Sequence, residues 1–246
     1  MNNELFKLSE DGKVLIEFIG DDDVTEVTIP EGVTVIGERA FWGCSSLKSI
    51  NIPDSVTKIG WGSFEDCDSL TKIALPNNVT SIRENTFQGC SGLTSVIIPN
   101  SVTEIGCYAF SDCSSLKFID IPESVTEIGE GAFEGCYFLT SINIPESLEE
   151  IGENAFEGCK SLKFIDIPVS VKKIGRDAFD SCKSLKSINI SEGVTEIGNG
   201  AFADCSSLTS INIPKSVTEI GRGAFDGCVN LTITCSYKAL QSMREE

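Results

Sequence analysis

Two aspartates stand where paired carboxylates could act on a glycosidic bond. Asp120 and Asp166 each follow Phe-Ile and precede Ile-Pro. If they lie two strands apart in one parallel sheet, their separation is roughly 10 Å, because neighbouring strands are about 4.8 Å apart. That distance slightly exceeds the range of inverting glycosidases, and the chain has no histidine to act as a general base. We therefore expect no catalytic residue and no enzyme activity, with glycoside hydrolysis as a remote alternative.

Eleven cysteines could form disulfides, hold a metal or act as nucleophiles. Nine of them recur every 23 residues, without any Cys-x-x-Cys motif or histidine beside them. A zinc site would need such pairs at short spacing, so we interpret the nine as a ladder of small buried side chains. The ladder consists of Cys44, Cys67, Cys90, Cys113, Cys136, Cys159, Cys182, Cys205 and Cys228. Cys107 and Cys235 stand outside it and are the candidates for a reactive thiol.

Acidic residues give no clearer sign of a metal. Asp21, Asp22 and Asp23 follow one another in a turn before the first repeat. They do not match the pattern of a Ca²⁺-binding loop, and we interpret them as a solvated turn. No metal and no cofactor are expected.

The cysteine interval belongs to a 23-residue unit that recurs over most of the chain. The unit beginning at Cys113 reads Cys-Ser-Ser-Leu-Lys-Phe-Ile-Asp-Ile-Pro-Glu-Ser-Val-Thr-Glu-Ile-Gly-Glu-Gly-Ala-Phe-Glu-Gly, and Cys136 starts it again. Self-similarity at this period is typical of a solenoid, in which each repeat buries its apolar residues against its neighbours. The segment Leu-x-x-Ile-x-Ile predicts a strand that ends at Pro, which cannot donate to a ladder. A second internal ladder is expected at Phe41, Phe64, Phe87, Phe110, Phe133, Phe156, Phe179, Phe202 and Phe225.

Both ends of the array have sequences that could cap it. Asp11-Gly12 lies between two alternating apolar runs, which is a strong hairpin signal. Such a hairpin would cover the core and strand edge of the first repeat. At the other end, Ser236 could cap a short amphipathic helix. We therefore divide the chain into a hairpin cap (1–20), a solenoid (21–235) and a helical cap (236–246).

The unit C-x-S-L-x-x-I-x-I-P-x-S-V-x-x-I-G-x-x-A-F-x-G resembles the BspA-like class of bacterial leucine-rich repeats over about residues 21 to 235. The departures are mild: Ser191 replaces Pro and Leu148 replaces Val, among others. The resemblance implies a curved, right-handed solenoid with a parallel β-sheet on its concave face. It also implies a non-enzymatic role in adhesion or recognition, commonly on cell surfaces and toward host proteins.

Charge excludes two classes of partner. The formal net charge is -18, from 37 acidic and 19 basic residues, and this field repels nucleic acid and anionic membrane surfaces. No apolar run is long enough to cross a bilayer. The amino terminus lacks the features of a secretory signal, so the chain as written is expected in the cytoplasm, or at the cell surface or secreted if a leader was removed.

Candidate binding residues lie between the buried positions of the strands, where side chains face outward. Most of these outward positions hold Ser or Asn, but Ile97, Phe118 and Phe164 are apolar. Apolar groups in the middle of a polar sheet predict a contact patch for a protein partner. Asp120, Asn143 and Asp166 lie in the neighbouring outward row and add hydrogen-bonding groups to the candidate site. Stacking Phe beside Asn and Asp also fits the alternative of a carbohydrate-binding module.

Overall fold

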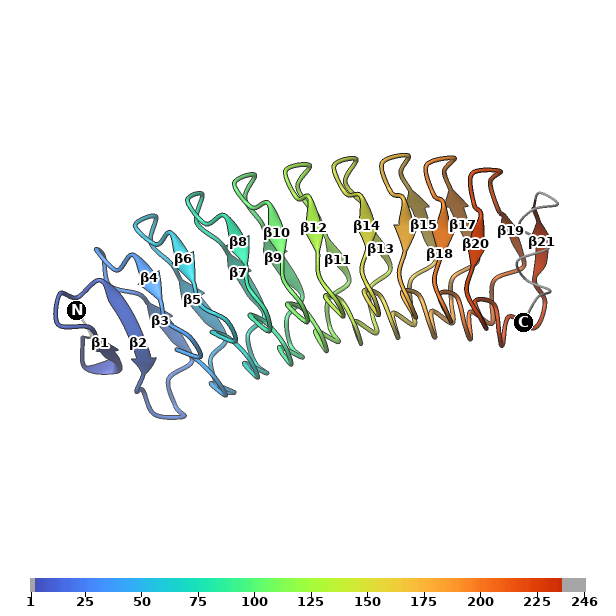
Figure 1. Ribbon diagram of the computed structural model, residues 1–246. Coiled ribbons are helices and arrows are strands. Elements are labelled where there is room, and N and C mark those ends of the chain that lie inside the picture. Colours follow the sequence, from blue (N-terminus) through green and yellow to red (C-terminus); the bar gives the residue numbers. More distant parts are fainter. Residues whose placement is uncertain (1–2, 236–246) are drawn as a thin grey trace.

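The computed structural model describes residues 3–235, which form a stack of coils along an arch (Figure 1). Each complete coil contributes one short strand to each of two parallel sheets. Strands pair one repeat apart, so Phe118 lies opposite Ser141 and Phe164 opposite Ser187. The predicted solenoid with parallel strands is confirmed. The predicted helix at 236–246 lies outside the described residues, and the domain boundaries stay predictions.

The first sheet is the one expected from the Leu-x-x-Ile-x-Ile segments. Its strands alternate outward and buried residues, as Glu26, Val27 and Thr28 do. Pro or a turn follows most strands. The strands are β3 (Glu26–Thr28), β5 (Ser49–Asn51), β7 (Lys72–Ala74), β9 (Ser95–Ile97), β11 (Phe118–Ile119), β13 (Ser141–Ile142), β15 (Phe164–Ile167), β17 (Ser187–Ile190), β19 (Ser210–Asn212) and β21 (Thr232–Thr234).

The second sheet was not predicted, because each of its strands is only two residues long. It forms at the Ile-Gly positions of the repeat, where the Ile is buried and the preceding residue points outward. Its strands are β4 (Val35–Ile36), β6 (Lys58–Ile59), β8 (Ser81–Ile82), β10 (Glu104–Ile105), β12 (Glu127–Ile128), β14 (Glu150–Ile151), β16 (Lys173–Ile174), β18 (Glu196–Ile197) and β20 (Glu219–Ile220).

Neither ladder of backbone hydrogen bonds is continuous within the described residues. The second is interrupted between β6 and β8 and between β12 and β14. The first is interrupted between β9 and β11, β13 and β15, and β17 and β19. At the β6–β8 interruption Arg83 occupies the position held by glycine in the other coils. That glycine lies against the preceding coil, as Gly106 does against Arg83 and Glu84.

An N-terminal hairpin covers one end of the core, as predicted. A short 3-10 turn, η1 (Asn3–Leu5), leads into β1 (Phe6–Leu8), which pairs antiparallel with β2 (Val14–Phe18). The connecting loop contains Gly12 at a positive φ of 69°, a conformation that glycine adopts at little cost. β2 then pairs with β4, so the hairpin extends the second sheet. The ring of Phe18 stacks on that of Phe41 with 5.4 Å between centroids.

The phenylalanine ladder runs through the centre of the stack. Successive rings from Phe41 to Phe225 are stacked, with centroid separations of 5.2 to 5.7 Å. Every ring from Phe41 to Phe202 is fully buried. These rings are core side chains, as the repeat spacing predicted.

The cysteine ladder is buried beside the rings and makes a specific hydrogen bond. The Sγ of Cys113 donates to the carbonyl oxygen of Phe87 at 3.2 Å, and Cys136 makes the same bond to Phe110. The equivalent bond recurs in each coil from Cys67 to Cys228. The carbonyl of Phe87 also accepts the backbone N–H of Cys90 at 3.1 Å, so the thiol fills the space and adds a second hydrogen bond that a methyl group could not make.

Burial makes the ladder thiols resistant to alkylation. It raises the pKa of the Cys113 and Cys159 thiols well above the ordinary value, and the thiolate is the reactive form. We expect iodoacetamide to modify the partly exposed Cys107 and to leave Cys113 and Cys159 intact in the folded chain. Peptide mass spectrometry after alkylation, with a urea-unfolded sample as control, tests this. Rapid modification of Cys113 would contradict it.

The same shift has a consequence for alkaline stability. A thiol whose pKa is raised by folding contributes its full stability below the pKa of the unfolded thiol, about 8.5. Above that pH the unfolded chain is stabilised by ionising, while the folded thiols stay protonated. The free energy of unfolding is thus expected to fall as the pH rises above about 8.5.

Candidate functional site

The outward face of the first sheet carries the three apolar residues predicted from the sequence. The exposed fractions are 63% for Ile97, 55% for Phe118 and 47% for Phe164. The residue next to each exposed side chain along its strand is buried, as Ile119 is beside Phe118 and Ile165 beside Phe164. Strand alternation therefore places the three side chains in solvent as expected.

A groove of about 720 Å³ lies over β11, β13, β15 and β17. Four of the six predicted binding residues line it, namely Phe118, Asn143, Phe164 and Asp166. Ile97 and Asp120 are not among its lining residues. The site that the structure assembles is therefore displaced toward the carboxyl-terminal side of the predicted one.

Val169 is a further member of the groove that the sequence reasoning missed. Its side chain is 60% exposed and it lies directly after Pro168. A signal was available, because the other coils carry a charged or amide side chain at this position. Those residues are Glu31, Asp54, Asn77, Asn100, Glu123, Glu146, Glu192 and Lys215. We call Phe118, Phe164 and Val169 the sheet patch.

Asn143 has a structural partner within the sheet. Its Oδ1 accepts a hydrogen bond from the backbone N–H of Ile121 at 2.9 Å, and its Nδ2 donates to the carbonyl of the same residue at 2.7 Å. The side chain thereby takes the place of a backbone ladder at the point where β11 and β13 end. An external ligand would have to share or displace these bonds.

The two aspartates considered for catalysis are separated by this asparagine. Asp166 lies beside Asn189 in the longer ladder of β15 and β17, whereas Asp120 follows β11 and does not line the groove. The groove therefore contains a single residue of the pair, and its other carboxylate is that of Glu146.

Aromatic residues outside the sheet pack on cations of the same or an adjacent coil. The guanidinium of Arg39 lies 4.4 Å from the ring centroid of Trp61 and 5.7 Å from that of Trp42. In another turn the Nζ of Lys160 lies 4.0 Å from the ring of Tyr137. These cation–π contacts give the three rings a packing partner, but Trp42 and Tyr137 stay exposed, as Phe138 does.

Residues 3–235 offer neither a metal-binding cluster nor a candidate membrane span. No group of three or more His, Cys, Asp or Glu side chains is arranged to hold a metal ion there. No helix in this part of the chain has the length and apolar character needed to span a membrane.

Comparison with known families and structures gives a consistent result. A family model described as "BspA type Leucine rich repeat region (6 copies)" matches residues 17–139 and 126–245. A leucine-rich repeat protein from Bacteroides ovatus is 32% identical with a TM-score of 0.81, over 94% of this chain and 66% of that one. This chain thus spans just under two thirds of that protein's length. Comparison with curated proteins returns no match.

Two further solved structures are similar. The T. pallidum leucine rich repeat protein TpLRR is 28% identical with a TM-score of 0.61, over 85% of this chain and 90% of that one. A leucine rich cell surface protein from Faecalibacterium prausnitzii is 26% identical with a TM-score of 0.50, over 94% and 92%. Because the family model covers nearly the whole array, the chain belongs to the BspA type leucine-rich repeat family.

Proposed function

We propose that this protein is a non-enzymatic binding module that recognises a protein partner through the sheet patch and its groove. Leucine-rich repeat proteins of this family generally mediate protein interaction or adhesion, and they are typically not enzymes. The observation that carries the proposal is the exposure of Phe118, Phe164 and Val169 around one groove of a sheet whose outward positions are mostly polar.

Burial of these side chains would supply much of the binding energy. Covering a fully exposed Phe or Val stabilises a complex by about 1.5–3 kcal/mol per side chain. The three are roughly half exposed, so the gain for each is smaller by about that proportion. Clustered aromatic anchors surrounded by polar groups are the usual composition of an interface hot spot.

The full pairing of β15 favours the same use. Phe164 belongs to the four-residue strand β15, which is paired along its whole length with β17. A side chain on such a strand loses little backbone freedom when a partner binds. Asp166, exposed on the same strand, adds a charge at the margin of the patch that would select the partner.

A host protein is one candidate partner, and a location at the cell surface or outside the cell belongs to the same proposal. The F. prausnitzii relative is described as a cell surface protein, which supports that location. A protein displayed there would meet host proteins rather than those of its own cytoplasm.

The experiment that tests the proposal is affinity capture with a paired variant. Wild type and Phe118→Ser/Phe164→Ser are immobilised and exposed to two lysates, one of host cells and one of the cells that produce this protein. Captured proteins are identified by mass spectrometry. Loss of two anchors is expected to weaken binding of a true partner at least about tenfold. The partner's lysate of origin also tests the location.

The matched control is Phe138→Ser, which removes an aromatic of similar exposure from a turn outside the groove. It should capture the same partner as wild type. All three proteins must have the same melting temperature. Equal capture by wild type and the double variant would refute the sheet patch.

Carbohydrate binding is the second candidate, favoured by Asp166 and Asn189 beside the exposed ring of Phe164. Hydrogen-bonding groups next to a stacking aromatic suit a sugar ring. A positive glycan array that a captured protein does not compete with would establish this alternative. Hydrolysis of a glycan, lost in Asp120→Asn, would instead revive catalysis.

A further inference from the structure

The first strand of the first sheet has an open edge. The N-terminal hairpin pairs with β4 and so extends the second sheet only. Within residues 3–235, β3 therefore pairs with β5 and with no other strand. An unpaired edge of this kind is a template for another strand.

The backbone groups at this edge can be assigned from the ladder on the other side. Thr25 accepts a hydrogen bond from Ser49, and Ile29 donates to Asn51. Neighbouring peptide groups of a strand point in opposite directions. The N–H and C=O groups of Glu26 and Thr28 consequently point away from β5, toward the open edge.

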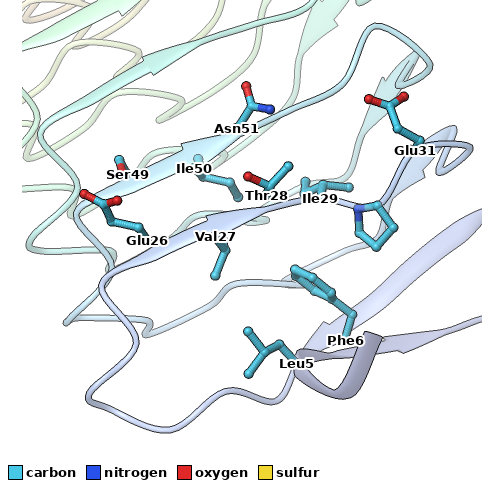
Figure 2. Close-up of a pocket in the computed structure, with 11 residues that line it drawn as sticks. Leu5, Phe6, Glu26, Val27, Thr28, Ile29, Glu31, Ser49, Ile50 and Asn51 are labelled. Atoms are coloured by element: carbon cyan, nitrogen blue, oxygen red, sulfur yellow. The ribbon is translucent and has the colours of Figure 1, made fainter. Parts of the chain in front are cut away.

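A groove of about 640 Å³ begins at that edge, between β3 and the residues Leu5 and Phe6, and extends over β3 to β5 (Figure 2). Leu5 and Phe6, from η1 and β1, lie on the side of β3 opposite β5. With Val27 and Ile29 they give the groove an apolar lining. In the other coils this side of the strand is occupied by the strand of the preceding coil. The part of the groove between β3 and Leu5 and Phe6 thus has the position of a missing strand.

The charge of the groove indicates what would fill it. Its lining includes the exposed carboxylates of Glu26 and Glu31, and none of its lining residues is basic. The chain as a whole carries a charge of -18. A second copy of this acidic chain would meet repulsion here, whereas a basic segment would be attracted.

We propose that the edge of β3 binds an extended, basic peptide of a partner protein, which pairs parallel to β3 as an added strand. Strand addition supplies affinity through backbone hydrogen bonds and specificity through alternate side chains. Residues beside Val27 and Ile29 would face the core and be apolar. The residue beside Glu26 would face outward and be Lys or Arg. The array itself contains this pattern in β7, where Lys72 precedes the buried Ile73.

The proposed surface is separate from the sheet patch. It lies at β3, near the amino-terminal end of the stack, whereas the sheet patch lies over β11 to β17. The two proposals can therefore fail independently, and Phe118→Ser/Phe164→Ser should leave peptide binding unchanged.

The test uses a fluorescent, terminally blocked synthetic peptide, Thr-Lys-Ile-Lys-Ile-Pro, titrated with the full chain and followed by anisotropy. Saturable binding is expected, and the peptide with Glu in place of both Lys residues should bind at least tenfold more weakly. Thr28→Pro removes an edge N–H that does not serve the β3–β5 ladder, and proline is tolerated on edge strands. This variant should lose binding at least tenfold with an unchanged melting temperature.

A pair of charge reversals separates the groove from the general field of the protein. Glu26→Lys changes a lining residue, and Glu38→Lys changes an exposed residue at the same end of the stack that does not line the groove. Only the first should weaken binding of the basic peptide, by about fivefold. Should Thr28→Pro itself fail to fold, the Glu26→Lys and Glu38→Lys pair still decides the proposal.

Four results would overturn it. They are no saturable binding of the basic peptide, equal binding of the acidic one, full binding by Thr28→Pro, and equal losses in the two charge reversals. Concentration-dependent self-association of the chain that Thr28→Pro abolishes would identify a second copy as the occupant instead, and would also refute the peptide.

Discussion

Replacing Phe133 with alanine is expected to lower the free energy of unfolding by about 3–5 kcal/mol. The ring is fully buried and stacks between Phe110 and Phe156, at centroid separations of 5.4 and 5.5 Å. Its removal leaves a cavity and breaks two aromatic contacts. In a repeat stack each coil is stabilised chiefly by its two neighbours, so the loss falls on both interfaces of the central coil.

Urea unfolding followed by circular dichroism measures this effect. Phe138→Ala is the matched control, because it removes the same side chain at an exposed position five residues along the chain. Its effect should lie within about 0.5 kcal/mol. A loss below about 1 kcal/mol for Phe133→Ala would contradict the continuous stack of rings.

Gly129→Ala is the second substitution for which we expect a large loss, about 1–3 kcal/mol. An added Cβ would lie 2.6 Å from the backbone nitrogen of Cys107 and 2.9 Å from the carbonyl carbon of Gly106. Backbone atoms cannot rotate away as a side chain can, so the two coils must separate. The hydrogen bond from the N–H of Gly129 to Ile105, 2.8 Å long, would lengthen or break.

The measurement combines thermal unfolding with hydrogen exchange of the peptides that span β10 and β12. The variant should melt at a lower temperature and exchange faster at this boundary, while Glu127→Ala, an exposed change in β12 two residues earlier, should alter neither. Unchanged exchange at β12 would show that the coils accommodate a methyl group. The interruption of the ladder at Arg83, which holds the equivalent position two coil boundaries earlier in the second sheet, agrees with the expected direction.

Repeat position predicted the core and the exposed apolar residues well. Phe133 and Cys136 are buried and Phe118 is exposed because strand alternation and coil closure depend only on the position within the repeat. The hairpin at Asp11-Gly12 was equally predictable, since the residues that favour its turn are adjacent in the sequence.

The features that the sequence did not predict depend on contacts between neighbouring coils. A repeat pattern describes one coil at a time and does not contain these contacts. The second sheet depends on two-residue bridges such as Ile105 to Ile128, whose pattern is too short to indicate a strand. The hydrogen bonds of Asn143 depend on the backbone of the preceding coil. The edge of β3 is open because the hairpin pairs with β4 of the second sheet and not with β3. The sequence predicted a cap but did not indicate which sheet it would extend. The binding role of the sheet patch residues stays a prediction.

The interruptions of the two ladders never fall at the same coil boundary. Where β6 and β8 are unpaired, β5 and β7 are paired, and where β9 and β11 are unpaired, β8, β10 and β12 form a continuous ladder. The aromatic stack crosses every one of these boundaries. Under tension along its long axis the molecule therefore has no plane of easy rupture among the described coils. Separating any two of them requires breaking at least one intact ladder together with a pair of stacked rings.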